Sequence, residues 1–356
     1  MDMVLVLEDG AVFRGVSFGA AGEACGWVHD DHRIVGYQEV LTDPDNAGCL
    51  INMTYPLIGN YGTNDEDAES DRLHVQGLII KEKSRIVSNW RATDTLENTM
   101  RAGKVVGMEQ VDTRALSLHI RDHGEMKGII GPAATSVGNL LDRLKTWKPP
   151  KIVSGKKKLK AFKGTGEYRA VLYDLGVKRS TFDQLRQCGC ELVVAGPSTS
   201  WEEIRRLDPD GLVVSSGPGD PRRAEAVTSE IGKAIGWVPI LGLGLGAQLI
   251  CLAAGGQVDP MKVGHHGCNY AVRDMETQAV AITDQNHSFV MTAGPDFLKE
   301  FKVSHINVND GTVEGISSAP LGVLGVQFVP RPDEEGGPSG VLGRFLRIME
   351  KNRKRD

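Results

Sequence analysis

Two glycine-rich turns hold the residues whose spacing is most typical of an active site. Residues 239–250 read PILGLGLGAQLI, in which an apolar strand runs into a dense glycine turn and then into an apolar helix. A second turn, SSGPGDP, occupies residues 215–221. Tight turns between a strand and a helix present nucleophiles or cradle phosphates. Residues 242–248, however, contain no cysteine, serine, lysine or acid.

The same turn also matches the dinucleotide-binding pattern G-x-G-x-x-A through Gly242, Gly244 and Ala247. That pattern normally opens a βαβ domain, whereas this turn follows the fourth strand expected in its domain. The acid that binds the ribose should stand about 20 residues further on, and only Asp259 is near that place. We therefore do not expect this turn to bind a dinucleotide, and we expect no cofactor.

Thiols and imidazoles elsewhere offer a second kind of chemistry. Cys251 lies inside an apolar helix pattern, which favours a buried core cysteine. Cys268 follows His265 and His266, and His287 lies on a later segment. From the residue types alone, this group leaves a metal site or a thiol–imidazole pair open.

Apolar runs alternate with amphipathic segments from residue 169 onward. The strand-like runs RAVLYDL, ELVVAGP, GLVVSS and PILGL are separated by helix-like segments, and GAQLICLAAGG ends on a double glycine. Near-continuous apolar strands between amphipathic helices predict a parallel sheet covered on both faces. Ligands bind at the carboxyl ends of such strands, where both glycine-rich turns are expected.

Residues 1–147 carry a different pattern. Short β-like runs, among them MVLVL, AVFRGVSF, HRIVGY, LHVQGLII and GKVVGM, alternate with turns, and helices are expected near residues 95–102 and 112–122. This pattern predicts a mixed α+β domain. Residues 148–168 are lysine-rich and contain Pro149-Pro150 near their start. For this stretch we expect a solvated linker rather than a docking strip for an acidic partner. A second domain is expected over residues 169–356.

Length and composition limit the function classes. The 356 residues suffice for two domains, and the net charge of −5 gives no general reason to expect binding to nucleic acid or an anionic membrane. No apolar run approaches the roughly 18 residues of a membrane span. The start MDMVLVLEDG lacks the features of a secretory signal. Six scattered cysteines without a CxxC pair indicate reduced thiols, so we expect a cytoplasmic protein.

The two turns, with QNHSF at 285–289 and VQFVPRP at 326–332, resemble the class I glutamine amidotransferase domain. The first half makes the resemblance closer, through VLVLEDGAVFRGVSFG, GYQEVLTDP, TYPLIGNYGTNDED and VDTRAL. With GHHGCN at 264–269, the chain resembles the small subunit of carbamoyl phosphate synthetase over nearly its whole length. The resemblance implies an α/β protein, with a mixed α+β domain followed by an amidotransferase domain whose mainly parallel sheet is flanked by helices.

The resemblance also implies a chemistry and a partner. In that family the small subunit hydrolyses glutamine at a Cys-His-Glu triad, and the ammonia passes to a large subunit that makes carbamoyl phosphate from bicarbonate and ATP. The first domain of the small subunit makes most of the contact. The family also carries G-H-H-G-x-N without a metal or nucleophilic role, so we expect no metal at His265, His266 or Cys268.

The sequence departs from the family at all three catalytic positions. The family elbow reads G-x-C-x-G-H-Q, and here Gly244 stands for its cysteine and Ala247 for its histidine. The family's Q-x-H-P-E aligns with residues 327–331, so the catalytic histidine becomes Val329 and the glutamate Arg331. A nucleophile elbow holds its residue at strained backbone angles, often with positive φ, which glycine adopts without a Cβ penalty. We expect the turn to persist without its reactive atom.

The glutamine pocket is altered as well. A serine that the family supplies from the first domain aligns with Ala47, and a pocket glycine aligns with Ser288. The hydroxyl lost at Ala47 and the side chain gained at Ser288 should both weaken the binding of glutamine. The retained pocket positions would be Gly217, Gly219, Leu245, Gln248, Asn286 and Phe289.

We therefore predict that this chain binds a large synthetase subunit and that its own glutaminase site is inactive. It would have a structural or regulatory role in an ammonia-using enzyme of pyrimidine or arginine biosynthesis. One alternative is a free-standing binding or signalling protein that uses the vacated pocket for another ligand. Another is an amidotransferase with a relocated nucleophile.

Overall fold

The computed structural model describes residues 1–150, 159–162, 167–295, 297–330 and 340–353. The chain divides into two compact units, one of residues 1–150 and 262–267, the other of residues 151–261 and 268–356. The first unit thus includes a short segment, Lys262–Gly267, from the middle of the second half of the sequence. No helix in the described part of the chain is long and apolar enough to cross a membrane.

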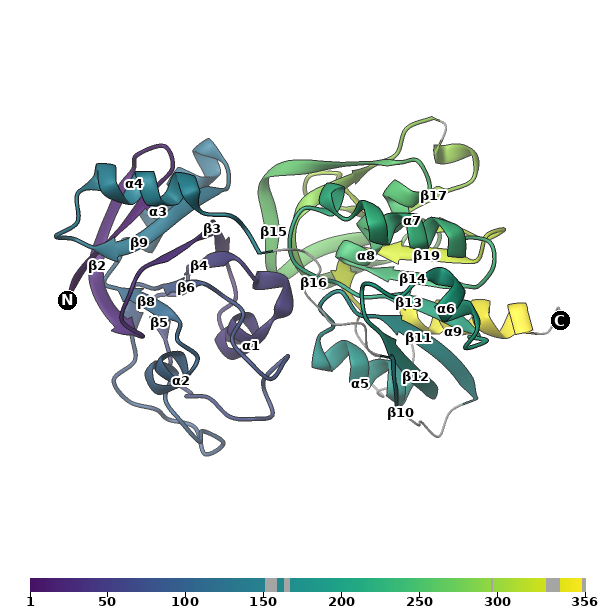
Figure 1. Ribbon diagram of the computed structural model, residues 1–356, viewed down its shortest axis with the longest axis horizontal. Helices are drawn as coiled ribbons and strands as arrows, with labels where there is room; N and C mark the ends of the chain where they lie inside the picture. Colours follow the sequence, from purple (N-terminus) through teal and green to yellow (C-terminus); the bar gives the residue numbers. More distant parts are fainter. Residues whose placement is uncertain (151–158, 163–166, 296, 331–339, 354–356) are drawn as a thin grey trace. The chain divides into compact units, whose positions relative to one another are not determined.

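Seven strands of the first unit close into a barrel. They are β1 (Asp2–Leu7), β2 (Val12–Gly19), β3 (Ala24–Asp31), β4 (Cys49–Met53), β6 (Gly77–Ile79), β8 (Val106–Glu109) and β9 (Met126–Pro132). Their order around the barrel is β1-β2-β8-β6-β4-β3-β9 (Figure 1). Closure pairs β1 with β9, so the barrel presents no open sheet edge. Buried side chains such as Leu5, Leu50 and Met108 form one cluster of its core.

Four helices are described in the first unit, and three of them begin at a side-chain cap. They are α1 (Tyr37–Thr42), α2 (Leu96–Ala102), α3 (Thr113–His123) and α4 (Val137–Thr146), with a single turn η1 (Pro44–Asn46) and two short paired strands, β5 (Leu57–Ile58) and β7 (Glu82–Lys83). The Thr95 hydroxyl caps α2, and the Asp112 carboxylate caps α3. The helices expected near 95–102 and 112–122 are therefore confirmed.

The strand expected in HRIVGY is wrong. Residues 32–36 lie outside any strand, and the Ile34 and Val35 side chains are 65% and 66% exposed. Gly36 has a φ of 95° and leads directly into α1. Two adjacent apolar residues satisfy a strand pattern, but here nothing in the described chain covers them, so burial does not favour the strand.

The Lys262–Gly267 segment is held in the first unit through Glu125. The Gly264 N–H donates to Glu125 Oε1 (2.6 Å), and His266 Nε2 lies 3.0 Å from the same oxygen. The His266 ring stacks on the His29 ring with 3.9 Å between centroids. Burial, and then the proximity of His266, lower the pKa of His29 to about 3.

The second unit is built on one long sheet. Its strands are β10 (Leu159–Phe162), β11 (Tyr168–Tyr173), β12 (Cys190–Ala195), β13 (Gly211–Val214), β14 (Ile240–Leu243), β15 (Gln257–Asp274), β16 (Val280–Thr292), β17 (Lys302–Asn307), β18 (Val313–Ser318), β19 (Val323–Val326) and β20 (Phe328–Val329). Their order is β10-β12-β11-β13-β14-β19-β18-β17-β15-β16-β20. The run from β12 to β19 is parallel, and the strands from β18 onward extend it in antiparallel fashion.

Helices cover both faces of the parallel part (Figure 1). They are α5 (Arg179–Gln187), α6 (Trp201–Arg205), α7 (Glu225–Ala234), α8 (Leu245–Ala253) and α9 (Gly340–Arg353), with the single turns η2 (Pro221–Arg223) and η3 (Phe297–Lys299). Along β11, Val171 and Tyr173 join the core cluster that contains side chains of α6, α7 and α8, while Ala170 and Leu172 join the cluster that contains side chains of α5 and α9. The predicted fold class is confirmed. Within residues 148–168, only β10 and residues 167–168 of the second unit, with 148–150 of the first, lie among the described residues.

Candidate functional site

The glycine-rich turn after β14 has the geometry of a nucleophile elbow. The chain leaves the strand at Gly244, which has φ 52° and ψ −116° and is the N-cap of α8. A positive φ is strained for a residue with a Cβ but not for glycine. The Gly244 N–H donates to the Val326 carbonyl (2.9 Å), and the Gly244 carbonyl accepts from the Ala247 N–H (3.0 Å). The positive φ expected at this turn is therefore present.

Close packing of α8 on the sheet explains the neighbouring glycines. A Cβ on Gly246 would lie 2.2 Å from the Val214 carbonyl oxygen, and a Cβ on Gly242 would lie 2.8 Å from the Cα of Ala247. Ala247 is fully buried, and its Cβ would be 3.2 Å from a Cβ on Gly325. The helix can approach the strands this closely only because these positions lack side chains.

The second glycine-rich turn, residues 215–221, lies against the elbow. Ser216 is the nearest neighbour of the place that a Gly244 side chain would occupy. Ser215 anchors the turn, because its Oγ accepts from the Leu175 N–H (2.9 Å) and donates to the Ser216 carbonyl (2.7 Å). A Cβ on Gly217 would lie only 2.5 Å from the Leu175 carbonyl oxygen, so this position also has room only for glycine.

An arginine joins this turn to β16. Asp220 binds the Arg222 guanidinium through both carboxylate oxygens, at 2.9 and 2.8 Å. Burial acts to raise the pKa of Asp220, but the hydrogen bonds from Arg222 outweigh it and the pKa is lowered. The guanidinium carbon lies 5.4 Å from the centroid of the Phe289 ring, a cation–π contact.

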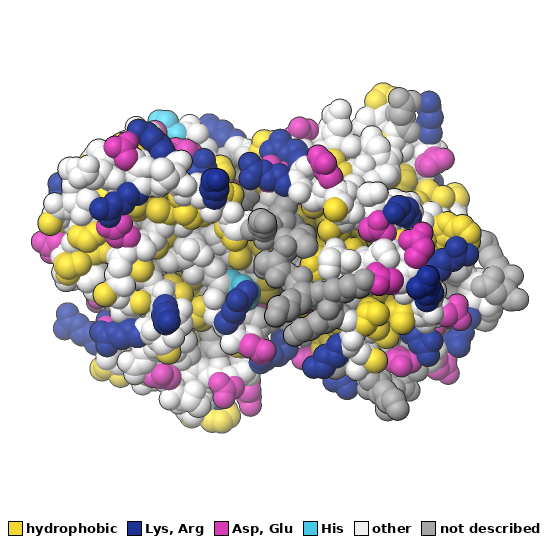
Figure 2. Space-filling model, in the orientation of Figure 1, with side chains coloured by type: hydrophobic (Ala, Val, Ile, Leu, Met, Phe, Trp, Pro, Cys, Tyr) yellow, Lys and Arg dark blue, Asp and Glu magenta, His cyan; other side chains and the backbone are white. Residues whose placement is uncertain are grey.

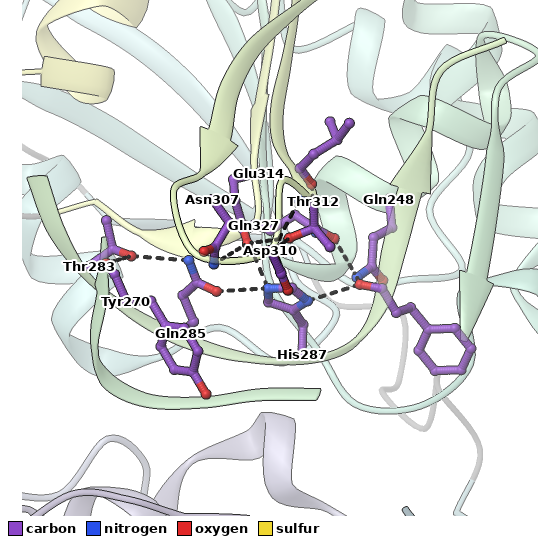
Figure 3. Close-up of polar contacts among 12 residues, drawn as sticks. Gln248, Tyr270, Thr283, Gln285, His287, Asn307, Asp310, Thr312, Glu314 and Gln327 are labelled. Atoms are coloured by element: carbon purple, nitrogen blue, oxygen red, sulfur yellow. Dashed lines mark hydrogen bonds and ion pairs between the residues drawn. The ribbon is translucent and has the colours of Figure 1, made fainter. Parts of the chain in front are cut away.

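A buried amide pair joins α8 to the sheet (Figure 3). Gln248, one turn into α8, donates from Nε2 to Gln327 Oε1 (2.8 Å) and to the Phe289 carbonyl (3.2 Å). The Gln327 Nε2 in turn donates to the Val313 carbonyl (3.0 Å). The Gln248 side chain is therefore held by protein groups from β16 and from the β19–β20 connection.

A buried histidine continues this network (Figure 3). His287 Nδ1 lies 2.9 Å from the Phe289 carbonyl, and Nε2 lies 3.1 Å from Gln285 Oε1 and 3.5 Å from Glu314 Oε2. Glu314 is fully buried, and Asn307 Nδ2 donates to its other oxygen (3.3 Å). Both ring nitrogens of His287 therefore lie close to oxygen atoms, which fix the orientation of the ring.

Comparison with known proteins identifies the family. Residues 5–130 match the family "Carbamoyl-phosphate synthase small chain, CPSase domain", and residues 171–335 match "Glutamine amidotransferase class-I". A carbamoyl phosphate synthase small chain from Syntrophotalea carbinolica is 38% identical over 379 residues, with 99% of each chain covered. The chain belongs to the carbamoyl phosphate synthase small-chain family.

A second relative agrees with this assignment. A carbamoyl phosphate synthase pyrimidine-specific small chain from Halalkalibacterium halodurans is 39% identical over 359 residues, which cover 100% of this chain and 99% of the relative. A solved glutamine amidotransferase from Thermotoga maritima is 13% identical with a TM-score of 0.38, and the match covers 53% of this chain and 84% of that one. Small chains of this family partner a large synthetase subunit.

In this small chain, two of the positions expected for a catalytic triad offer no group that can attack or transfer a proton. Gly244 has no side chain. Val329 lies in β20, where it pairs with Asp284 and is half-buried, and its aliphatic side chain cannot exchange a proton. The third expected position, Arg331, lies outside the described residues.

The positions expected to bind glutamine are divided between the units of this small chain. Ala47 follows η1 in the first unit. In the second unit the structure brings the Gln248 side chain to the Phe289 carbonyl, and the elbow to the turn that contains Gly217 and Gly219. Leu245 opens α8. The remaining two positions, Asn286 and Ser288, are half-buried on β16 and alternate with the buried Gln285 and His287, so they lie on the opposite face of the strand.

The cysteines fall in different places in the small chain. Cys251 is fully buried, and burial raises the pKa of its thiol to about 12, so the expected core cysteine is confirmed. Its Sγ contacts the Gln257 carbonyl at 3.6 Å. Cys268 is exposed, whereas the nearby His266 is buried against His29 and Glu125 in the first unit.

Sequence reasoning did not single out Gln285, Glu314 or Gln327 as parts of this site. A signal exists for Glu314, because a charged residue inside the strand-like run TVEGIS is costly unless it has a buried partner. Gln285 and Gln327 stand beside motif residues, but nothing local indicates that their amides join α8 to the sheet.

Proposed function

We propose that this chain is a non-catalytic small subunit, which binds a large synthetase subunit and serves a structural or regulatory role in an ammonia-dependent carbamoyl phosphate synthetase. The observation that carries the proposal is Gly244, which keeps the elbow backbone but has no atom to attack an amide carbon. Loss of the nucleophile from a triad enzyme costs on the order of 10⁶ in rate. Family membership supports the large subunit as the partner.

The described surroundings of the elbow offer no activated replacement. Cys251 is buried, and its raised pKa disfavours the thiolate. Ser216 has a hydroxyl near the elbow, but no imidazole or carboxylate among the described residues hydrogen-bonds to it. A serine without such a base is a weak nucleophile at neutral pH. These contacts support the proposal over a relocated nucleophile.

The direct test is glutamate release from glutamine by the purified chain, alone and with its large subunit. We expect no release above the no-enzyme control, and no mass increase with a thiol-trapping glutamine analogue. A trace of an active glutaminase added to the same assay shows that slow release would be detected. Sustained release at several turnovers per chain, without added glutaminase, overturns the proposal.

The second test addresses the role in the complex. With bicarbonate and ATP, the complex should form carbamoyl phosphate from ammonium and not from glutamine. If glutamine serves as well as ammonium, an amide-cleaving centre is present. If the large subunit does not bind at micromolar concentration, the partnership fails.

The buried hydrogen bonds of Gln248 and His287 favour a second candidate function. In it, the small chain binds a ligand at the former glutamine site without cleaving it. Gln248 and His287 both contact the Phe289 carbonyl, so the backbone at this expected pocket position is held in place. Calorimetric titration with glutamine distinguishes the two, because the primary proposal expects no heat of binding. A cytoplasmic location is part of the proposal, supported by six free cysteines.

A further inference from the structure

Two histidines and an aspartate lie together on the surface of the first unit. His119 and His123 are four residues apart on α3, so their side chains leave the same face of the helix on successive turns. Their rings are stacked, with the centroids 4.3 Å apart and the planes at 22°. His119 Nε2 lies 2.6 Å from Asp9 Oδ2, in the turn between β1 and β2. Two elements of the barrel unit therefore bring two imidazoles and a carboxylate to one place.

The turn between β1 and β2 holds Asp9 in position. Asp9 Oδ1 accepts from the Ala11 N–H (3.0 Å), which leaves Oδ2 to face His119. Gly10 has a φ of 92°, and its N–H donates to the Leu7 carbonyl (2.9 Å). Burial acts to raise the pKa of Asp9, but the hydrogen bonds from Ala11 and His119 outweigh it and the pKa is lowered. At neutral pH Asp9 is therefore a carboxylate that accepts a hydrogen bond from His119.

Each of the two imidazoles has one nitrogen that an acceptor of the protein holds. His123 Nδ1 lies 3.0 Å from the His119 carbonyl, and His119 Nε2 faces Asp9. A carbonyl and a carboxylate both need a donor, so these two nitrogens carry protons. The other two nitrogens, His119 Nδ1 and His123 Nε2, make no hydrogen bond within the described part of the chain. Imidazoles oriented in this way, with a lone pair on the second nitrogen, are typical metal ligands.

We propose that His119 and His123 bind a divalent transition metal ion of the class that prefers imidazole, such as Zn²⁺, with Asp9 as the acceptor that orients His119. Tetrahedral coordination with Zn–N bonds of about 2.0–2.1 Å places two ligand nitrogens about 3.4 Å apart. Rings whose centroids are 4.3 Å apart need only small side-chain rotations to reach that spacing. Water fills the remaining coordination positions.

The place of the pair on its helix also favours a cation. α3 ends at His123, and the last carbonyls of a helix carry partial negative charge. The alternative is a simple ion pair between His119 and Asp9. That pair needs a proton on both nitrogens of His119, and it gives the stacked His123 ring no role. A metal ion uses both rings and the acceptor of each.

The test is calorimetric titration of the full chain, without an affinity tag, with zinc chloride in a buffer that does not chelate metals. Asp9→Asn should raise the Kd for Zn²⁺ by about 10–100-fold, as loss of an orienting acceptor does. His119→Gln and His123→Gln should each raise it further, because each removes a ligand. The double variant of the two histidines should bind one Zn²⁺ fewer than the parent, which separates this site from any other that the chain contains.

Two matched controls remove the same chemical groups nearby. His32→Gln removes an exposed imidazole of the first unit whose Nδ1 lies 3.2 Å from the Thr54 hydroxyl. Asp122→Asn removes the carboxylate next to His123, which is paired with Arg121 (3.0 Å). Both should leave the Kd for Zn²⁺ unchanged. Circular dichroism and thermal unfolding without metal show that every variant folds like the parent.

Electron paramagnetic resonance with Cu²⁺ gives a second measurement, because coupling of the copper electron to two imidazole nitrogens should appear in the parent and be lost in the double variant. Failure of the parent to bind Zn²⁺ overturns the proposal. The same number of bound ions and the same Kd in the parent and the double variant also overturn it. If the two controls weaken binding as much as His119→Gln and His123→Gln do, the ion is held by general surface charge and the site is wrong. A Kd unchanged by Asp9→Asn overturns the orienting role of Asp9.

Discussion

A Cβ placed on Gly244 would lie 3.1 Å from the Cβ of Ser216. That spacing is tighter than ordinary van der Waals contact, and the φ of 52° adds backbone strain for any side chain. The space in front of the elbow is therefore partly closed by the neighbouring turn. On the face of the molecule in Figure 2, Lys and Arg side chains lie among Asp and Glu side chains.

We predict that Gly244→Cys alone will not hydrolyse glutamine catalytically. A free thiol has a pKa near 8.5 and needs a neighbouring base to become a good nucleophile, and Val329 supplies none. The variant should also lose about 1–3 kcal/mol of unfolding free energy because of the strained φ. Steady-state glutamate release and urea unfolding measure the two effects. Robust multiple turnover would mean that a base stands in the site and that Val329 is misaligned with the catalytic histidine.

Adding Val329→His and Arg331→Glu to Gly244→Cys should produce weak turnover, because the three changes restore a thiol, a base and a group that orients the base. Further reversion of Ala47→Ser and Ser288→Gly should lower KM more than it raises kcat, since both positions act on glutamine binding. The matched control is the pair Val329→His and Arg331→Glu without the cysteine, which should remain inactive. Activity of that control would place the nucleophile elsewhere.

Glycine-to-alanine changes at equivalent helix positions should act in opposite directions. Gly246 is the second residue of α8, and an added Cβ would meet the Val214 carbonyl at 2.2 Å. We expect Gly246→Ala to destabilise the protein by about 1–3 kcal/mol or more, as overpacking does. Gly138 is the second residue of α4, with nothing within 4 Å of its Cβ position, so Gly138→Ala should stabilise by about 0.5–1 kcal/mol. Urea unfolding of both variants tests the close approach of α8.

The buried pair of His287 and Glu314 should be energetically coupled. Removing one partner leaves a buried polar atom of the other without its contact, so His287→Gln or Glu314→Gln alone should cost about 1–3 kcal/mol. The double variant should cost less than the sum, with a coupling of about 0.5–3 kcal/mol. The exposed pair of Lys233 and Glu230 (2.7 Å) is the comparison and should show much weaker coupling. Additive effects at His287 and Glu314 would contradict an energetically significant contact between the two side chains.

Stability should fall as the pH drops below neutrality. His29 binds a proton near pH 6.5 in the unfolded chain, but only near pH 3 in the folded one. The stabilisation from burying neutral His29 is therefore fully present above pH 6.5 and is lost as the pH falls from 6.5 towards 3. Over that range the free energy of unfolding should fall by up to about 1.4 kcal/mol per pH unit. The groups that face it are His266, Glu125 and Arg33. His29→Phe should flatten the pH dependence of the unfolding free energy between pH 7 and 5, and identical slopes would contradict this assignment.

The local conformation at the elbow could be predicted because strand, glycine and helix follow one another within a few residues. The partner of Gln248 could not, because Gln327 lies 79 positions away and only the folded sheet brings the two amides together. The same distinction applies to the first unit. Alternating apolar residues indicate β1 and β9 as strands, but their pairing across the barrel depends on contacts distant in the sequence.

The prediction for Cys251 succeeded for a related reason. Its helix is apolar apart from Gln248, so burial of Cys251 follows whichever way the helix packs. Ile34 and Val35 misled the strand prediction because two apolar residues carry the same local signal whether or not other elements cover them.

The placement of Lys262–Gly267 in the first unit has a consequence for genetic exchange between relatives. A single crossover near residue 150 would join one parent's barrel to the other parent's version of this segment. His266 and Gly264 would then come from a different lineage than the His29 ring and the Glu125 carboxylate they contact. The two halves are therefore not free modules, and a functional chimera has to carry residues 262–267 together with the barrel on which they rest.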